Sequence, residues 1–181
     1  MLTYNIFESA GNVVVQTSGS LNLSGATQGG PDACGTNGVV DSANAIVCTG
    51  SDQVANTYLV TGPTFFNGTA STSSTSVSGI FTGIVGFQSQ FLIDPTYVST
   101  TEIVSSATFN GQTLATLGFT TTGPIGTWTL NGTSETIQVI LGAPAVAVPG
   151  PLPLLGAGAA FGWSRRLRKR ISAPLITPPQ A

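Results

Sequence analysis

Two cysteines, Cys34 and Cys48, are the first residues of this chain that could do chemistry. A thiol reacts as its thiolate, which a neighbouring His or Lys stabilises. The chain has no His and no Lys near either cysteine, so a catalytic thiol is disfavoured. The two thiols are either free or bonded, and we expect a disulfide if the protein reaches an oxidising compartment. That bond would close a loop of about fifteen residues and contribute about 3 kcal/mol.

Seven carboxylates supply the other candidate chemistry. Asp32, Asp41 and Asp52 lie in a loop-rich region and could ligate Ca²⁺, which prefers several oxygen ligands. Their spacing matches no EF-hand, and Asp is favoured in turns for its own backbone hydrogen bonds. We therefore interpret the three as turn residues and expect no metal and no cofactor. Asp94 and Glu102 are an alternative pair for glycoside hydrolysis, which needs two carboxyl groups roughly 5 to 9 Å apart.

Aromatic side chains offer a binding rather than a catalytic hypothesis. Exposed rings on a sheet would form a carbohydrate platform, for which the candidates are Tyr4, Tyr58, Tyr97 and Trp128. Core packing is the better interpretation for Trp128, because it alternates with Leu130. A polysaccharide-binding or adhesive module is therefore an alternative to a purely structural role.

Charge and composition exclude several functional classes. The absence of His excludes catalytic triads and metal sites that use His. The absence of Lys before residue 169 excludes a P-loop lysine and Schiff-base catalysis in the body. All seven carboxylates precede residue 136, while all five cations follow residue 164. The negative body would repel phosphates, so we expect no nucleic-acid partner. With only 7% charged residues, its surface must consist mainly of Ser, Thr, Asn, Gln and Gly.

The sequence around these residues predicts strands and turns. Residues 12–23 and 74–87 alternate loosely between β-branched and small polar side chains, as half-buried antiparallel strands do. No window before residue 150 has a convincing helical period. Turn signals between short strands predict an all-β antiparallel β-sandwich or jelly-roll-like domain rather than a parallel sheet with crossover helices.

Four Asn-Gly pairs are candidate type I′ hairpin turns, at residues 37–38, 67–68, 110–111 and 131–132. The clearest hairpin surrounds the last of these. There Trp128 and Leu130 share one strand face, and Ile137, Val139 and Leu141 share a face after the turn. A second hairpin is predicted across Asn110-Gly111. Its first strand would place Ile103, Ser105, Ala107 and Phe109 on one face.

Proline positions and composition divide the chain into four parts. We expect a β domain over 1–142 and a Pro-rich linker over 143–150. A C-terminal membrane helix with a basic end would span 151–171, followed by a disordered tail over 172–181.

The membrane helix is argued from length and charge. The apolar run Leu152–Trp163 is shorter than the roughly 20 residues that cross a bilayer. The membrane-spanning helix could nevertheless be longer than this run, because proline is accepted in the first helical turn and long basic side chains can reach the lipid headgroups. The basic anchor consists of Arg165, Arg166, Arg168, Lys169 and Arg170. The alternative is an ordinary buried helix with a solvated basic end.

Val148-Pro149-Gly150-Pro151, followed by the Leu/Gly/Ala run and the basic anchor, resembles the C-terminal sorting signal of PEP-CTERM proteins. In that family the third motif position is usually Glu, and the form with Gly150 looks like a cyanobacterial variant. Stretches of the body, such as 11–25 and 91–141, also resemble exported members of the family.

The resemblance implies a route rather than a catalytic activity. The protein would be exported and held by its C-terminal helix in membrane lipid. An exosortase-type membrane protease would then cut it near Pro149 to Pro151. The product would reside in the cell envelope or outside the cell, often alongside exopolysaccharide. We accordingly expect a non-enzymatic structural or surface protein.

Overall fold

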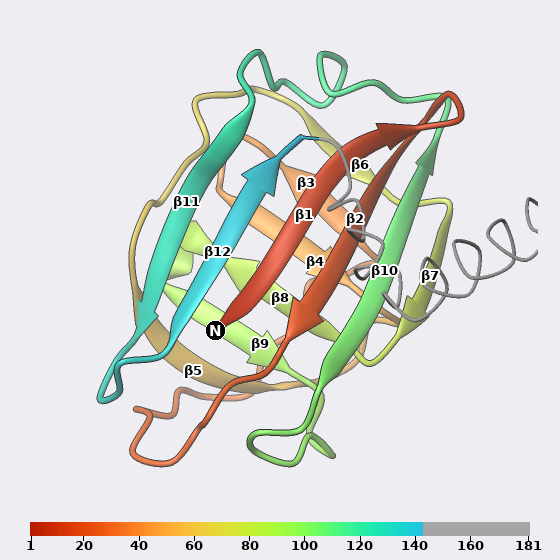
Figure 1. Ribbon diagram of the computed structural model, residues 1–181. Helices are drawn as coiled ribbons and strands as arrows, with labels where there is room; N and C mark the ends of the chain where they lie inside the picture. Colours follow the sequence, from red (N-terminus) through yellow and green to blue (C-terminus); the bar gives the residue numbers. More distant parts are fainter. Residues whose placement is uncertain (143–181) are drawn as a thin grey trace, which may run out of the picture. The chain divides into compact units, whose positions relative to one another are not determined.

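The computed structural model describes residues 1–142, which fold as an all-β domain (Figure 1). The all-β prediction is confirmed, and this part of the chain contains no α-helix, only a 3₁₀ turn, η1, at Gly86–Gln88. The strands are β1 Leu2–Ser9, β2 Asn12–Gly19, β3 Val39–Asp41, β4 Ile46–Thr49, β5 Asn56–Thr61, β6 Ser71–Ser73, β7 Ser76–Gly79, β8 Thr82–Val85, β9 Gln90–Ile93, β10 Ile103–Asn110, β11 Gly123–Leu130 and β12 Thr136–Leu141.

The strands form one curled sheet in the order β6-β3-β4-β8-β9-β5-β11-β12-β1-β2-β10-β7. Strands β3, β4, β8 and β9 lie behind β12, β1, β2 and β10 in Figure 1. The two halves join where β11 pairs with β5 over only two residue pairs. At the far edge the chain itself passes from β6 to β7 through residues 74–75. The sheet therefore folds back over its own inner face.

Side chains from both halves fill the space between them. The largest fully buried ones include Trp128, Tyr4, Phe91 and Phe109. Phe66 packs its ring against Trp128 with centroids 5.8 Å apart and nearly perpendicular planes, an arrangement that aromatic quadrupoles favour. Burying each large side chain stabilises the fold by about 1.5–3 kcal/mol relative to exposure. This shared core fixes every strand that positions the residues discussed below.

The predicted face of β10 is confirmed, since Ile103, Ser105, Ala107 and Phe109 are all buried. The predicted hairpin around Asn131-Gly132 is confirmed as well, with Trp128 opposite Ile137 in the antiparallel pair β11–β12. Its turn differs in detail. Of the two central residues, Asn131 and Gly132, only Gly132 has a positive φ (87°). This is the pattern of a type II turn, whereas type I′ needs a positive φ at both positions.

The hairpin predicted across Asn110-Gly111 is wrong. Strand β10 pairs with β2 and β7, and residues 111–122 form turns instead of a return strand. Thr113 and Thr116 explain the difference. The Thr113 N–H donates to Thr116 Oγ1 over 2.8 Å, and Thr116 Oγ1 donates to the Thr113 carbonyl over 2.9 Å. Such local side-chain bonds compete with a strand ladder.

The type I′ geometry occurs at Ala10-Gly11, which the Asn-Gly pattern does not include. Ala10 (φ 50°) and Gly11 (φ 78°) join β1 to β2, with Ser9 directly opposite Asn12. The predicted antiparallel arrangement holds for the other strand pairs of residues 1–142 but not for β1 and β12. Strand β1 lies parallel to β12, with Leu2 opposite Ile137, because β1 inserts between its hairpin partner and the last strand.

The strand predicted over 74–87 is divided into β7 and β8. Gly79 causes the break, since its φ of 79° belongs to the left-handed region, which side chains other than glycine rarely adopt. The chain then crosses to the other half of the sheet, where β8 pairs with β4 and β9.

The predicted linker, membrane helix, sorting motif and basic anchor lie outside the described residues. Within residues 1–142, no helix has the length and apolarity needed to cross a bilayer.

Candidate functional site

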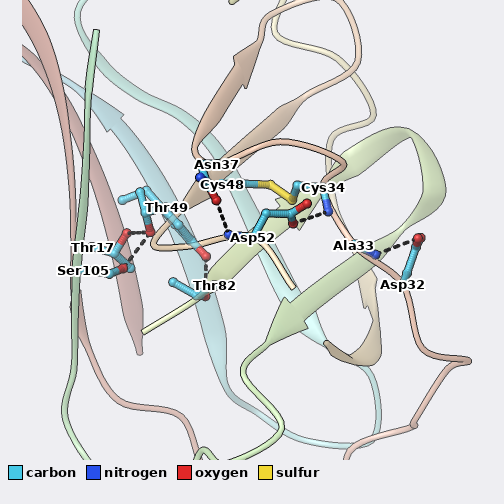
Figure 2. Close-up of a disulfide and its surroundings, with 11 residues drawn as sticks. Thr17, Asp32, Ala33, Cys34, Asn37, Cys48, Thr49, Asp52, Thr82 and Ser105 are labelled. Atoms are coloured by element: carbon cyan, nitrogen blue, oxygen red, sulfur yellow. Dashed lines mark hydrogen bonds between the residues drawn. A yellow bond between two sulfur atoms is a disulfide. The ribbon is translucent and has the colours of Figure 1, made fainter. Parts of the chain in front are cut away.

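Cys34 and Cys48 form a disulfide, with their Cα atoms 6.6 Å apart (Figure 2). Cys48 lies on β4 and is fully buried, whereas Cys34 lies in the loop before β3 and is half-buried. The bond therefore attaches a long loop to a central strand. Of the two states left open by the sequence, the structure contains the bonded one.

Polar contacts hold the loops on either side of this disulfide. The Cys34 N–H donates to Asp52 Oδ1 over 3.0 Å, and the Asp52 N–H donates to Asn37 Oδ1 over 2.7 Å. Figure 2 shows Asp52 between these two partners. Asp52 thus joins the segment before β3 to the segment after β4, so that the disulfide and the carboxylate support the same loop pair.

Gly83 on β8 makes room for the disulfide. A Cβ at this position would lie 2.6 Å from Cys48 Sγ and 3.0 Å from Cys34 Sγ. Glycine within a strand often marks such a close approach. The sequence gives no local reason for Gly83, and the disulfide supplies one.

A group of buried hydroxyls lies next to the disulfide. Thr49 follows Cys48 and its Oγ1 lies 2.8 Å from Thr17 Oγ1 and 2.6 Å from Ser105 Oγ. Figure 2 shows these three hydroxyls pointing toward one another from β2, β4 and β10. Neither of Thr49's partners is a base that could activate a nucleophile. The cluster therefore joins the two halves of the sheet rather than forming a catalytic group.

The Tyr4 hydroxyl extends this polar layer. Its oxygen lies 2.7 Å from Thr82 Oγ1, and Thr82 is opposite Thr49 in the β4–β8 pair. Burial raises the pKa of the Tyr4 phenol far above its ordinary value, against the smaller opposing effect of the Thr82 hydrogen bond. Tyr4 therefore stays protonated at physiological pH and serves as a hydrogen-bonding core residue.

Asp32 and Asp41 make local contacts, whereas Asp52 bonds to Cys34 and Asn37 in a separate segment. Asp41 Oδ1 accepts the N–H groups of Ala43 and Asn44, while Asp32 accepts from Ala33. These are turn contacts of the kind predicted. Among residues 1–142, no three His, Cys, Asp or Glu residues gather as metal ligands.

Asp94 and Glu102 lie at opposite ends of the loop between β9 and β10. Partial burial of Asp94 raises its pKa, but hydrogen bonds from the Thr96 side chain, the Thr96 N–H and Gln53 outweigh burial and lower it overall. A glycosidase acid needs the reverse, a raised pKa that retains its proton. This environment suits Asp94 to holding its own loop.

The predicted aromatic platform is wrong for Tyr4 and Trp128, which are completely buried. The core interpretation of Trp128 is confirmed, and its indole N–H donates to the Pro63 carbonyl over 2.9 Å. Tyr58 and Tyr97 are half-buried. The Tyr97 hydroxyl donates to backbone carbonyls and accepts the Leu21 N–H, so it serves loop packing.

Among residues 1–142, the exposed aromatic side chains are Phe65 and Phe87, with 57% and 50% of their surface accessible. Neither residue is among the four aromatic candidates predicted from the sequence. For Phe65 a signal existed in the Phe65-Phe66 doublet, since neighbouring side chains of an extended chain point in opposite directions. Phe87 was assigned to a strand that in fact ends before η1.

No protein family, curated protein or solved structure matches this chain. The functional conclusion therefore rests on the residues themselves. Two features stand out in the described part of the chain. One is the disulfide with its supporting loops, and the other is the pair of exposed phenylalanine rings.

Proposed function

We propose that this chain is an exported protein of the cell envelope or extracellular matrix, sorted by its C-terminal tail. The observation that carries the proposal is the disulfide between Cys34 and Cys48. Structural disulfides persist in oxidising compartments outside the cytosol and are rare within it. The bond thus agrees with the export that the tail sequence implies.

The distribution of charge supports the same proposal. The body carries every carboxylate and the segment 165–170 carries every Lys and Arg. Basic residues next to an apolar segment favour the cytoplasmic face of a membrane. A body without cationic side chains is free to lie on the other side.

The sorting step is proposed from the tail. Val148-Pro149-Gly150-Pro151 would be recognised by an exosortase-type membrane protease while the segment 151–171 lies in membrane lipid. Cleavage near the motif would release the β domain. The domain itself is proposed to be a non-enzymatic surface module of the β-sandwich or jelly-roll-like type, because its two sheet halves enclose one core.

The absence of activated groups in the described residues supports a non-enzymatic role. The buried hydroxyls bond to one another, and the hydrogen bonds of Asp94 lower its pKa. The hydroxyls have no base among these partners, and a lowered pKa makes Asp94 unsuited to be the proton-retaining acid of a glycosidase.

The test is fractionation of host cells that produce the full chain or a variant with all five basic residues of 165–170 replaced by Gln. The expected result is processing of the wild type and accumulation of the unprocessed variant, because the neutral tail no longer anchors at the inner membrane face. A matched control replaces the acidic residues Asp32 and Glu102 by Asn and Gln, which changes charge in the body alone. Equal processing of all three chains would contradict the proposal.

A further inference from the structure

Phe65 is fixed in an exposed position by the residues around it. The Pro63 carbonyl accepts the Trp128 indole N–H, and Phe66 is 8% exposed and packs against Phe119 and Trp128. Both ends of this short segment are therefore attached to the core. In Figure 1 the segment runs along the outer side of β11. Phe65, which lies between the two attachments, is directed outward and is 57% exposed.

Phe87 is held outward by a different turn. It is the central residue of η1, which the hydrogen bond from the Ser89 N–H to the Gly86 carbonyl closes. Gly86 is buried, and a Cβ there would lie 2.6 Å from Ala45 Cβ and from the Pro63 carbonyl oxygen. This close packing brings η1 against the Phe65 segment and leaves the Phe87 ring 50% exposed.

The turn at residues 42–45 makes backbone hydrogen bonds with both of the segments that bear these rings. The Phe66 N–H donates to the Ser42 carbonyl over 3.0 Å, and the Phe87 N–H donates to the Asn44 carbonyl over 3.1 Å. Asp41 holds the same turn through the N–H groups at positions 43 and 44. The segments that carry the two rings are thus bonded to the same turn, beside the exposed Asn44, whose side-chain N–H donates to Asp41 Oδ2 over 3.0 Å. These bonds hold the segments in place before any ligand binds, which reduces the entropic cost of binding.

The chemistry of this surface selects a class of ligand. Two exposed rings on neighbouring segments form an apolar patch, and such patches often mark binding sites. The described residues contain no Lys or Arg, which disfavours anionic ligands. Two rings and one amide are few beside the roughly 20–30 residues per partner of a typical protein interface. An uncharged sugar chain fits, because its C–H faces stack on aromatic rings and its hydroxyls bond to amides.

We propose that Phe65, Phe87 and Asn44 form a binding site for an uncharged polysaccharide. The proposal does not depend on the sorting signal, because it concerns only the β domain. It differs from the platform expected from the sequence, since its rings come from loops and none of the four predicted aromatic residues takes part.

The experiment measures retention of the full-length protein in native gels that contain dextran, galactomannan or soluble xylan. Retention of the wild type by at least one of these glycans is expected. Phe65→Ala and Phe87→Ala should each weaken binding by roughly tenfold, and the double variant should migrate as it does without glycan. Val98→Ala, which removes a side chain that is 65% exposed on another loop, is the matched control and should bind as the wild type does.

Thermal unfolding of each variant separates binding from folding, because truncating exposed rings should leave the midpoint unchanged. Absence of retention on all three glycans would overturn the proposal. Equal retention of the wild type and the double variant would overturn it as well. Dimerisation of the wild type that the double variant loses, without glycan retention, would assign the surface to self-association and also contradict it.

Discussion

Gly83 illustrates how one residue connects the sheet to the disulfide. A strand position normally favours a β-branched or aromatic side chain. A Cβ at this one, however, would lie 2.6 Å from Cys48 Sγ, closer than real Cβ atoms come. The residue is therefore determined by a contact with Cys48, which lies on another strand, β4. This explains why the choice cannot be understood from the strand alone.

We predict that Gly83→Ala destabilises the domain by about 1–3 kcal/mol, as overpacking of a buried site does. Urea unfolding of the oxidised protein measures the loss. Gly30→Ala is the matched control, because a Cβ there meets no atom within 4 Å. If both variants unfold at the wild-type urea concentration, the close packing of Gly83 against the disulfide is wrong.

A second prediction concerns Glu135 and pH. The hydrogen bond from the Met1 ammonium group lowers the pKa of Glu135 below its ordinary 4.5. Partial burial opposes this, and the Asn22 N–H and the ammonium charge add to it. Because the folded pKa is the lower one, the contribution is complete above about pH 4.5 and is lost as pH falls through the folded value.

The measurement is the urea midpoint between about pH 6 and about pH 3 for the wild type and Glu135→Gln. The variant should lose less stability on acidification, by under about 1 kcal/mol, since the pair is near the surface. Glu102→Gln, whose side chain is exposed, should follow the wild type. Identical pH curves for Glu135→Gln and the wild type would rule out this contribution.

At the scale of elements, the disulfide and the hydroxyl cluster join strands that are distant in sequence. Cys48 and Thr49 are consecutive on β4. The first attaches the loop before β3, and the second contacts β2 and β10. Strand β4 thus links the two halves of the sheet from within, while the pairing of β5 with β11 links them at the edge.

We predict that the double variant Cys34→Ala and Cys48→Ala loses about 3 kcal/mol, the value expected for an unbridged loop of this length. Urea unfolding of the variant and of the wild type, each with and without reductant, provides the measurement. Reductant should lower the wild-type midpoint and leave the variant unchanged. An unaffected wild-type midpoint under full reduction would show that the bond adds no stability.

The elements also show how far the sequence predicts this fold. The alternation in β10 and the Asn131-Gly132 hairpin follow from side-chain patterns and are found as predicted. The turns at 113–116 and the parallel placement of β1 beside β12 are not. A local pattern specifies which face of a strand is buried, whereas its neighbours in the sheet depend on contacts with distant segments.

The candidate site was predictable to a smaller extent. The pairing of Cys34 with Cys48 could be proposed from the residues, since they are the only two cysteines. Phe65 and Phe87 could not be selected in the same way. Whether a ring is buried or exposed depends on which loop lies over it, and the loop that covers Trp128 is also the one that exposes Phe65.

At the scale of the whole molecule, the sequence combines an acidic, disulfide-bonded β domain with a basic tail. The two carry different parts of the proposed function. The domain would be the part displayed outside the cell, and the tail would direct it there. The opposite charges of the two segments agree with this division, because the cytoplasmic side retains basic residues.

The most direct test of the central claim is the intact mass of the protein recovered from its host, determined with and without thiol alkylation. The account predicts a chain that lacks residues 165–181, is found outside the cytosol and has both cysteines resistant to alkylation until reduced. Recovery from the cytosol of the chain with these residues attached and both thiols free would contradict it.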